Sequence, residues 1–400
     1  MKVLIANNYY FPNMEGGAEF SIKLLAENLV KKGCDVYVLS MDGKQKLFND
    51  SVEVINGVKV IRVYSKPIYR RRILKDKSHF IDKFLNGVHS IWNWSMDKKV
   101  REIIDEIRPD IIHSNNLVSM SYWIWKYAKK SSIPVVHTLR DYWLLDPTTN
   151  IGGTPEILAF FFRIYHRRLS NKYVNLVTSP SDRTLEIFKE KGYFIKCDQQ
   201  KIVNAIDFDY NLLNKILKDK LNRSSKKVNF IFAGKVSENK GIKILINAFI
   251  KSNVKGSLTI CGSGDLNVWI EKKNNKQIIL KGRLSQEELF EEYRKADVLI
   301  VPSLWEEPFG RIVIEGAQYA LPIIGSDRGG IPEIIRELNF GEIFDITKER
   351  QLLELIQKFS NRNYLKNYLL RGPENLNQYS VFIQVKHFIE IYKRCIDRNV

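Results

Sequence analysis

Two glutamates eight residues apart, Glu307 and Glu315, flank a Pro-Phe-Gly turn within the stretch 302–315. The turn follows an apolar run, and Pro308 suits a first helical turn, so we expect a helix to begin at about that residue. The backbone amides at its start would form a phosphate site; they belong to Phe309, Gly310 and Arg311. Carboxylates beside a phosphate make sense if they accept hydrogen bonds from sugar hydroxyls, as acidic residues do from ribose. The alternative is an ordinary helix whose acidic start favours the helix dipole, with Glu315 solvated.

Two lysines in the stretch 232–241 lie in a loop between a predicted strand and a predicted helix. Lys235 follows Gly234 directly, and Lys240 precedes Gly241. Two mobile cations at this place could clamp a pyrophosphate. In a chain with 63 lysines and arginines, two solvated lysines are the alternative.

Two further glycine-rich turns follow predicted strands. Gly16 and Gly17 open the first helix, and Gly262 begins a Gly-Ser-Gly turn. Glycine lets a backbone approach a ligand closely, which would suit a nucleotide. Neither turn has the Gly-x-Gly-x-x-Gly spacing of a dinucleotide site, so simple turns are the alternative.

Three residues with side chains capable of chemistry end another predicted strand: His137, Arg140 and Asp141. Together they favour a site more than a single histidine would, because a single histidine is more often structural. Asp207 and Asp209 have the spacing of a metal-binding Asp-x-Asp pair, but they lie in the expected interdomain region. No cluster with metal-ligand spacing stands out elsewhere, so we expect no metal cofactor.

Short runs rich in Val and Ile alternate with amphipathic segments, as buried strands alternate with helices in a parallel sheet. The first series of runs lies at 2–6, 35–40, 58–63, 110–114, 134–139 and 175–179. The second series lies at 228–234, 257–262, 278–282, 298–302 and 322–326. A polar stretch at 211–227 interrupts the pattern between them, and helices are expected at 21–32 and 381–398.

This α/β pattern predicts two doubly wound, Rossmann-like domains, 1–205 and 206–380, that face each other across a cleft. The final helix is expected to pack on the first domain or to bridge both. Ligands of such sheets bind at the carboxyl ends of the strands. The cleft is therefore the expected ligand site.

In their order along the chain, these motifs resemble those of the family-4 glycosyltransferases, which have the two-domain GT-B fold. Glu307-Pro-Phe-Gly with Glu315 matches the family's Glu-x7-Glu signature, and a Gly-Gly-x-Pro-Glu segment follows at 329–333. The other similar features are the glycine loop at 16–19, the basic pair Lys235 and Lys240, and the Asn-Ala-Ile-Asp turn at 204–207. The resemblance covers most of the chain.

The resemblance implies a retaining transfer from a nucleotide sugar, such as a UDP- or GDP-sugar, without a metal. Glu307 would hold hydroxyls of the donor sugar, and Glu315 those of the ribose. Lys235, Lys240 and the helix amides would stabilise the negative charge on the leaving diphosphate, which is usually the largest catalytic contribution.

Two positions depart from the family's pattern. Lys235 stands where arginine is more common, which loses bidentate binding. Arg140 stands where many relatives have a histidine thought to contact the transferred sugar or the acceptor. Arginine cannot act as a base, but it could bind a phosphate or polarise a hydroxyl.

The formal net charge of +18 favours anionic partners: phosphorylated small molecules, anionic lipid or nucleic acid. Two stretches, 64–100 and 157–172, mix basic residues with aromatic ones, as surfaces that bind anionic lipid do. Both lie in the first domain, which carries the acceptor site in the GT-B fold. We therefore predict a lipid-linked or other glycan acceptor, in cell-surface polysaccharide or glycolipid synthesis. The alternative is that the apolar residues are core and the basic ones solvated.

No apolar run reaches the ~18 residues of a membrane-spanning helix, and the four scattered cysteines suit a reducing cytosol. The first residues are typical of a strand rather than a signal peptide. The expected location is cytoplasmic, at the inner face of the cell membrane. Two other classes remain open: a sugar-nucleotide epimerase or sugar phosphorylase of the same architecture, and a basic nucleic-acid-binding protein. No recognised nucleic-acid-binding module supports the latter, so no specific nucleic acid partner is expected.

Overall fold

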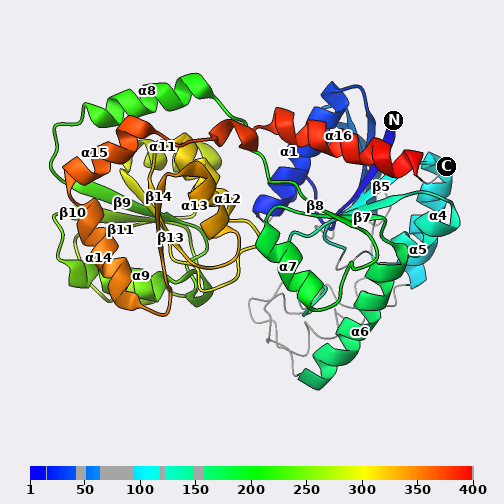
Figure 1. Cartoon of the computed structure of the whole chain (residues 1–400), viewed down its shortest axis with the longest axis horizontal. Helices are drawn as coiled ribbons and strands as arrows, with labels where there is room; N and C mark the ends of the chain where they lie inside the picture. The colour runs from blue at the N-terminus through cyan, green and yellow to red at the C-terminus, as the bar shows by residue number, and fades with distance from the viewer. Residues whose placement is uncertain are drawn as a thin grey trace. The chain divides into compact units, whose positions relative to one another are not determined.

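The computed structural model describes residues 1–14, 16–41, 51–63, 94–117, 120, 122–146 and 156–398. The chain divides into two compact units, which are described here one at a time (Figure 1). Unit 1 comprises Met1–Ala205 with Val381–Val400, and unit 2 comprises Ile206–Ser380. Most of the basic and aromatic stretch predicted to meet a membrane at 64–100 lies outside the described residues.

Unit 1 is built on an eight-stranded sheet with the order β3-β4-β2-β1-β5-β6-β7-β8. Neighbouring strands are parallel except β3, which pairs antiparallel with β4. Strands β5, β6 and β7 are buried along their whole length, as their runs of Val and Ile predict. The strands are β1 (Lys2–Ala6), β2 (Asp35–Met41), β3 (Ser51–Ile55), β4 (Val58–Val63), β5 (Ile111–Ser114), β6 (Val135–Thr138), β7 (Leu176–Ser179) and β8 (Asp198–Lys201).

The first and the last helix of the chain share the core of unit 1. α1 (Gly17–Lys31) buries Ile22 and Leu25 on the stripe that helical spacing predicts. α16 (Val381–Asp397) lies beside α1 (Figure 1) and adds Phe388 and Tyr392 to the same core. The other described helices of this unit are α4 (Trp94–Ile107), α5 (Trp123–Lys130), α6 (Glu156–Tyr173) and α7 (Asp182–Glu190).

A buried histidine joins α16 to the sheet. His113 on β5 places Nδ1 2.6 Å from the Tyr392 hydroxyl and Nε2 2.6 Å from the Thr138 hydroxyl. Burial lowers the pKa of His113 well below its usual value, so the ring is neutral. Both ring nitrogens are hydrogen-bonded, which gives this polar group a structural role.

Unit 2 is built on a six-stranded, parallel sheet with the order β11-β10-β9-β12-β13-β14. Its strands are β9 (Val228–Ala233), β10 (Gly256–Cys261), β11 (Ile278–Gly282), β12 (Val298–Val301), β13 (Ile323–Ser326) and β14 (Gly341–Phe344). Its helices are α8 (Tyr210–Leu221), α9 (Ile242–Ser252), α10 (Asn267–Glu271), α11 (Gln286–Lys295), α12 (Arg311–Gln318), α13 (Ile331–Leu338), α14 (Glu349–Phe359) and α15 (Arg362–Arg371).

The polar stretch expected to interrupt the pattern at 211–227 is largely folded as α8. Asp209 caps this helix by accepting from two amides of its first turn, at 2.9 and 3.1 Å. Leu213 and Ile216 are buried, and so is Lys220, whose Nζ donates to two backbone carbonyls at 3.2 and 3.3 Å. The interpretation as an interruption was wrong because lysines and asparagines on the exposed side obscure a short apolar stripe.

Candidate active site

The loops after β9 and β12 lie next to each other at the centre of the unit 2 sheet. The chain adds β10 and β11 on one side of β9 and β12 to β14 on the other, so the strand order reverses between β9 and β12. In open α/β sheets, ligands bind outside the carboxyl ends of the strands at such a switch point. Lys235 and Lys240 follow β9, and Glu307 follows β12. The topology therefore brings these predicted site residues to the edge where a ligand is expected.

Lys240 and Glu307, predicted from separate motifs, bind each other. Lys240 ends a 3₁₀ turn (Glu238–Lys240), and its Nζ donates to Glu307 Oε1. The same ammonium lies 5.1 Å from the centre of the Trp305 ring, within cation–π range. The side chains are 30% and 14% exposed respectively, so the ion pair is only partly screened by water. Lys235, in contrast, is exposed directly after Gly234.

Ser303 is a third member of this cluster that the sequence analysis missed. Its hydroxyl lies 3.0 Å from Glu307 Oε1, the oxygen that also accepts from Lys240. Ser303 is buried, and the Ser326 hydroxyl donates to its carbonyl at 2.8 Å. The only signal in the sequence is a small polar residue directly after an apolar strand and a proline.

The loop after β12 is held by backbone contacts with the loops after β9 and β13. The carbonyl of Asn239 accepts from the amides of Leu304 and Trp305, at 2.9 and 3.2 Å. The carbonyl of Glu307 accepts from the amide of Gly330 at 2.8 Å. The backbone that carries Glu307 is therefore fixed on both sides.

Gly234 and Gly262 lie side by side after β9 and β10. The amide of Gly234 donates to the carbonyl of Cys261 at 2.9 Å. A Cβ on Gly262 would lie 1.8 Å from the carbonyl oxygen of Gly234. These predicted binding residues thus let two loops approach closely, whatever they bind.

The helix predicted to begin at about Pro308 begins three residues later. Gly310 precedes α12 with φ 94°, a left-handed conformation, and Arg311 is the first helical residue. Phe309 lies before the helix with its side chain buried. The phosphate-binding amides predicted at Phe309 and Gly310 are therefore not part of a first helical turn, because the chain turns at the glycine before it coils.

Glu315, predicted to bind ribose hydroxyls, is paired with Arg311 one turn earlier in α12. Arg311 Nε donates to Glu315 Oε1 at 2.7 Å, and the two side chains are 13% and 18% exposed. The alternative of a solvated Glu315 is therefore wrong. Burial, followed by the nearby Glu315 carboxylate, raises the pKa of Tyr293 well above its usual value.

In unit 1, Arg140 is held at the carboxyl end of β6 by two asparagines. Its Nε donates to Asn115 Oδ1, and its Nη1 donates to Asn204 Oδ1, both at 2.7 Å. Asn115 follows β5, and Asn204 follows β8. Sequence reasoning missed both asparagines as partners because they are 25 and 64 residues away along the chain.

The residues predicted beside Arg140 have structural surroundings. His137 is buried, lies 3.0 Å from the Ser114 hydroxyl through Nδ1 and stacks on Phe194. Burial lowers the pKa of His137 to about 3, so it is a neutral core residue. Asp141 accepts from the side chain of Asn116 at 2.5 Å, and burial raises its pKa.

The glycine pair predicted near the N-terminus lies at the start of α1. Gly17 is the first residue of α1, which begins four residues earlier than expected. The amide of Gly16 donates to Glu19 Oε2 at 2.9 Å, as in a capping box. The backbone of Gly16 is extended, so its conformation alone does not require glycine.

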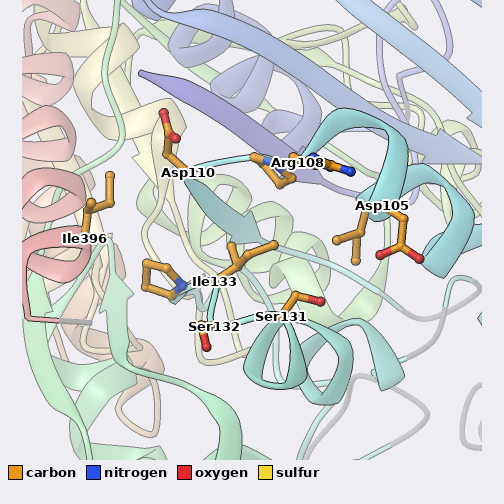
Figure 2. A pocket seen from close by; sticks show the side chains of 10 residues that line it. Asp105, Arg108, Asp110, Ser131, Ser132, Ile133 and Ile396 are labelled. Carbon is orange, nitrogen blue, oxygen red and sulfur yellow. The ribbon is translucent and has the colours of Figure 1, made fainter. Parts of the chain in front are cut away.

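A pocket of about 550 Å³ opens at the opposite end of the unit 1 strands, among the loops that precede β5 and β6 (Figure 2). The amide of Lys2 donates to Asp110 at this pocket, at 2.6 Å. The pocket thus lies at the amino ends of the strands, away from the motifs described above. Its labelled lining residues are Asp105, Arg108, Asp110, Ser131, Ser132, Ile133 and Ile396.

Within the described ranges, no group of three or more His, Cys, Asp or Glu residues could hold a metal ion. The expectation that the reaction needs no metal stays a prediction. In the same part of the chain, no helix is long and apolar enough to cross a membrane.

Two protein-family models match the chain, and together they span most of it. Residues 15–209 match Glycosyltransferase Family 4, and residues 214–371 match Glycosyl transferases group 1. The chain belongs to this glycosyltransferase family. Its fold is GT-B, and it is a transferase, as the resemblance implied.

Two curated relatives indicate where similar chains occur. An uncharacterized 42.6 kDa protein in the cps region of Klebsiella pneumoniae is 28% identical and covers 84% of this chain and 88% of its own. The O-antigen chain mannosyltransferase C of Escherichia coli is 20% identical and covers 98% of this chain and 97% of its own.

Solved structures share the fold over the whole length. The sucrose-phosphate synthase of Thermosynechococcus elongatus superposes with a TM-score of 0.76 at 15% identity, covering 99% of both chains. Anabaena HepE in complex with UDP and glucose has a TM-score of 0.67 at 16% identity, covering 98% of this chain and 99% of its own.

Proposed function

We propose that this chain is a retaining glycosyltransferase that moves a sugar from a nucleotide sugar, such as a UDP- or GDP-sugar, to a hydroxyl of a glycan. The observation that carries the proposal is the Lys240–Glu307 pair at the switch point of the unit 2 sheet, in a chain of the glycosyltransferase family. The ammonium suits the diphosphate of the donor, and the carboxylate suits hydroxyls of its sugar. The complex of HepE with UDP and glucose supports a donor of this class.

In the proposed reaction, the bond between the anomeric carbon and the diphosphate breaks, and a bond from that carbon to the acceptor oxygen forms on the same face. The electron pair leaves with the diphosphate. Lys240 and Lys235 would stabilise this developing anion, which is usually the largest catalytic contribution. Glu307 would orient the sugar through its hydroxyls. These two lysines are the proposed source of positive charge in place of a metal.

The proposed acceptor is a lipid-linked glycan, in cell-surface polysaccharide or glycolipid synthesis at the inner face of the cell membrane. The printed names of the Klebsiella and Escherichia relatives, a cps-region protein and an O-antigen mannosyltransferase, support this choice. So does the surface of α6 in unit 1. There Phe160 and Phe161 are 51% and 65% exposed, and Arg167 and Arg168 follow on the same helix.

The first test is thermal unfolding of the purified chain with UDP, GDP, ADP and CMP, each with and without an attached sugar. A ligand present at 100 times its Kd adds about 2.7 kcal/mol to the free energy of unfolding. We expect one base to give a clear rise in Tm. If none of these nucleotides stabilises the chain, the proposed donor site is wrong.

The second part of the test replaces the paired residues. Lys240→Ala and Glu307→Ala should each abolish release of nucleoside diphosphate from the selected donor while the protein stays folded. Lys243→Ala is the matched control, because Lys243 is exposed and pairs with Glu238. Wild-type rates in folded Lys240→Ala and Glu307→Ala would contradict the assignment of the site.

A further inference from the structure

Glu307 and Lys240 satisfy each other in this structure, although the proposed function needs both for the donor. Nζ of Lys240 donates to Oε1 of Glu307. A diphosphate bound by Lys240 would use the same ammonium. Resting on the proposed function, we propose that Glu307 competes with the diphosphate for Lys240 and so promotes release of the nucleoside diphosphate after the sugar has been transferred.

Glu307 is the fixed partner of this pair. Its Oε1 lies 3.0 Å from the buried Ser303 hydroxyl, and its backbone carbonyl accepts from the Gly330 amide at 2.8 Å. A Cβ on Gly329 would lie 2.0 Å from the same carbonyl oxygen, which shows how closely the two loops pack. Glu307 therefore keeps its position when its cation moves away.

Lys240 is the partner that can move. Its ammonium stands on a flexible four-carbon stem and carries three donors that rotate freely. Its side chain is 30% exposed, about twice the exposed fraction of Glu307. When a diphosphate arrives, the ammonium can turn toward it, while Ser303 still donates to Glu307.

The donor and the product then differ in one contact. With the nucleotide sugar bound, a sugar hydroxyl can donate to the Glu307 oxygen that Lys240 has left. After transfer, the diphosphate product has no such hydroxyl, so Glu307 lacks that partner and faces a second anion at the same ammonium. The ion pair of Lys240 with Glu307 then opposes the contact of Lys240 with the diphosphate.

The test is calorimetric titration of wild type and Glu307→Gln with UDP, GDP and ADP. Glutamine keeps the size of the side chain and an acceptor for Ser303, but it removes the competing charge. Because a partly exposed ion pair contributes about 1 kcal/mol, the Kd of the bound diphosphate should fall about fivefold in Glu307→Gln. Turnover of the nucleotide sugar should be lost in the same variant.

Glu306→Gln is the matched control, because it removes the same charge from the neighbouring residue. Glu306 accepts from the amide of Gly329 at 2.7 Å and lies 3.7 Å from Arg328. Its replacement should change the Kd less than twofold. In a Lys240→Gln background, the further change Glu307→Gln should no longer tighten binding, because the ammonium for which they compete is gone.

The outcomes separate this inference from the proposed function. Equal or weaker binding of the diphosphate by folded Glu307→Gln overturns the competition, even if the transferase is real. Equal tightening by Glu306→Gln also overturns it, because the effect would then be one of general charge. Absence of nucleotide binding in wild type and in Glu307→Gln contradicts the proposed function itself.

Discussion

At the scale of single residues, Gly241 separates the cation of the site from the helix that follows it. Its φ is 72°, and a Cβ there would lie 1.7 Å from the carbonyl oxygen of Pro302. Pro302 immediately precedes Ser303. Any side chain at position 241 must therefore displace the loop that carries Ser303 and Glu307, or the turn that ends at Lys240.

Gly241→Ala should for this reason reduce turnover of the nucleotide sugar by more than tenfold and lower the free energy of unfolding by about 2 kcal/mol or more. Gly282→Ala is the matched control, because Gly282 has φ 68° and nothing within 4 Å of an added Cβ. It should cost only the backbone strain, about 1 kcal/mol. Urea unfolding and donor turnover measure both variants, and equal losses in the two would contradict the steric argument.

Residues that matter through sequence spacing were predictable, and residues that matter through folding were not. Glu307 and Lys240 stand in motifs of their own, so the sequence indicated each, but not that they bind each other across 67 positions. Ser303 could not be predicted, because its significance comes from a hydroxyl turned toward Glu307. Asn204, which holds Arg140, is hidden for the same reason.

At the scale of elements, eleven strands were predictable because Val and Ile cluster where a strand is buried on both faces. β8 is missing from that series because its sequence, Asp-Gln-Gln-Lys, is polar and lies at the edge of its sheet. β3 is also an edge strand, and it exposes Val52 and Val54. The start of α12 was misplaced because Pro308 fits a first helical turn, whereas the left-handed Gly310 lies between it and the helix.

The element with the clearest prediction for the acceptor is α6. Ile157, Phe160 and Phe161 expose 70%, 51% and 65% of their surface near its start. Basic residues follow toward its end, as in helices that lie at an anionic lipid surface. Phe160→Ser combined with Phe161→Ser should therefore reduce binding to phosphatidylglycerol vesicles at low salt by about tenfold, measured by flotation.

Phe382→Ser is the control for α6, because Phe382 is 60% exposed on α16 of the same unit. Its replacement should leave vesicle binding within twofold of wild type. If the wild-type chain does not float with anionic vesicles, or if all variants float equally, α6 is not a membrane surface.

At the scale of the whole molecule, the two units differ in how they respond to acid. All six histidines of the chain lie outside residues 206–380, so unit 2 has none. In unit 1, burial lowers the pKa of His137 to about 3 and that of His166 to about 4. An unfolded histidine takes up a proton near its usual pKa of about 6.5, whereas these two remain neutral in the folded unit.

The sign of the effect follows from that difference in proton uptake. Between pH 6.5 and 4 the unfolded chain binds more protons, so acidification lowers the free energy of unfolding. At pH 5.5 each of the two histidines costs unit 1 about 1 kcal/mol relative to pH 7.5. Hydrogen exchange of the intact chain, corrected for intrinsic rates, should therefore show β6 and β7 losing protection on acidification while β9 and β12 change less.

His166→Phe isolates one of the two contributions. The ring of His166 is packed among Tyr122, Trp143 and Phe162, and its Nε2 has no hydrogen-bond partner, so phenylalanine fits both the shape and the chemistry. The loss of protection between pH 7.5 and 5.5 should shrink in this variant by about 1 kcal/mol. Asp141, whose raised pKa acts in the opposite direction, is present in both proteins and cancels from the comparison. An unchanged pH dependence in His166→Phe, or an equal loss in unit 2, would show that acid acts on this molecule through other groups.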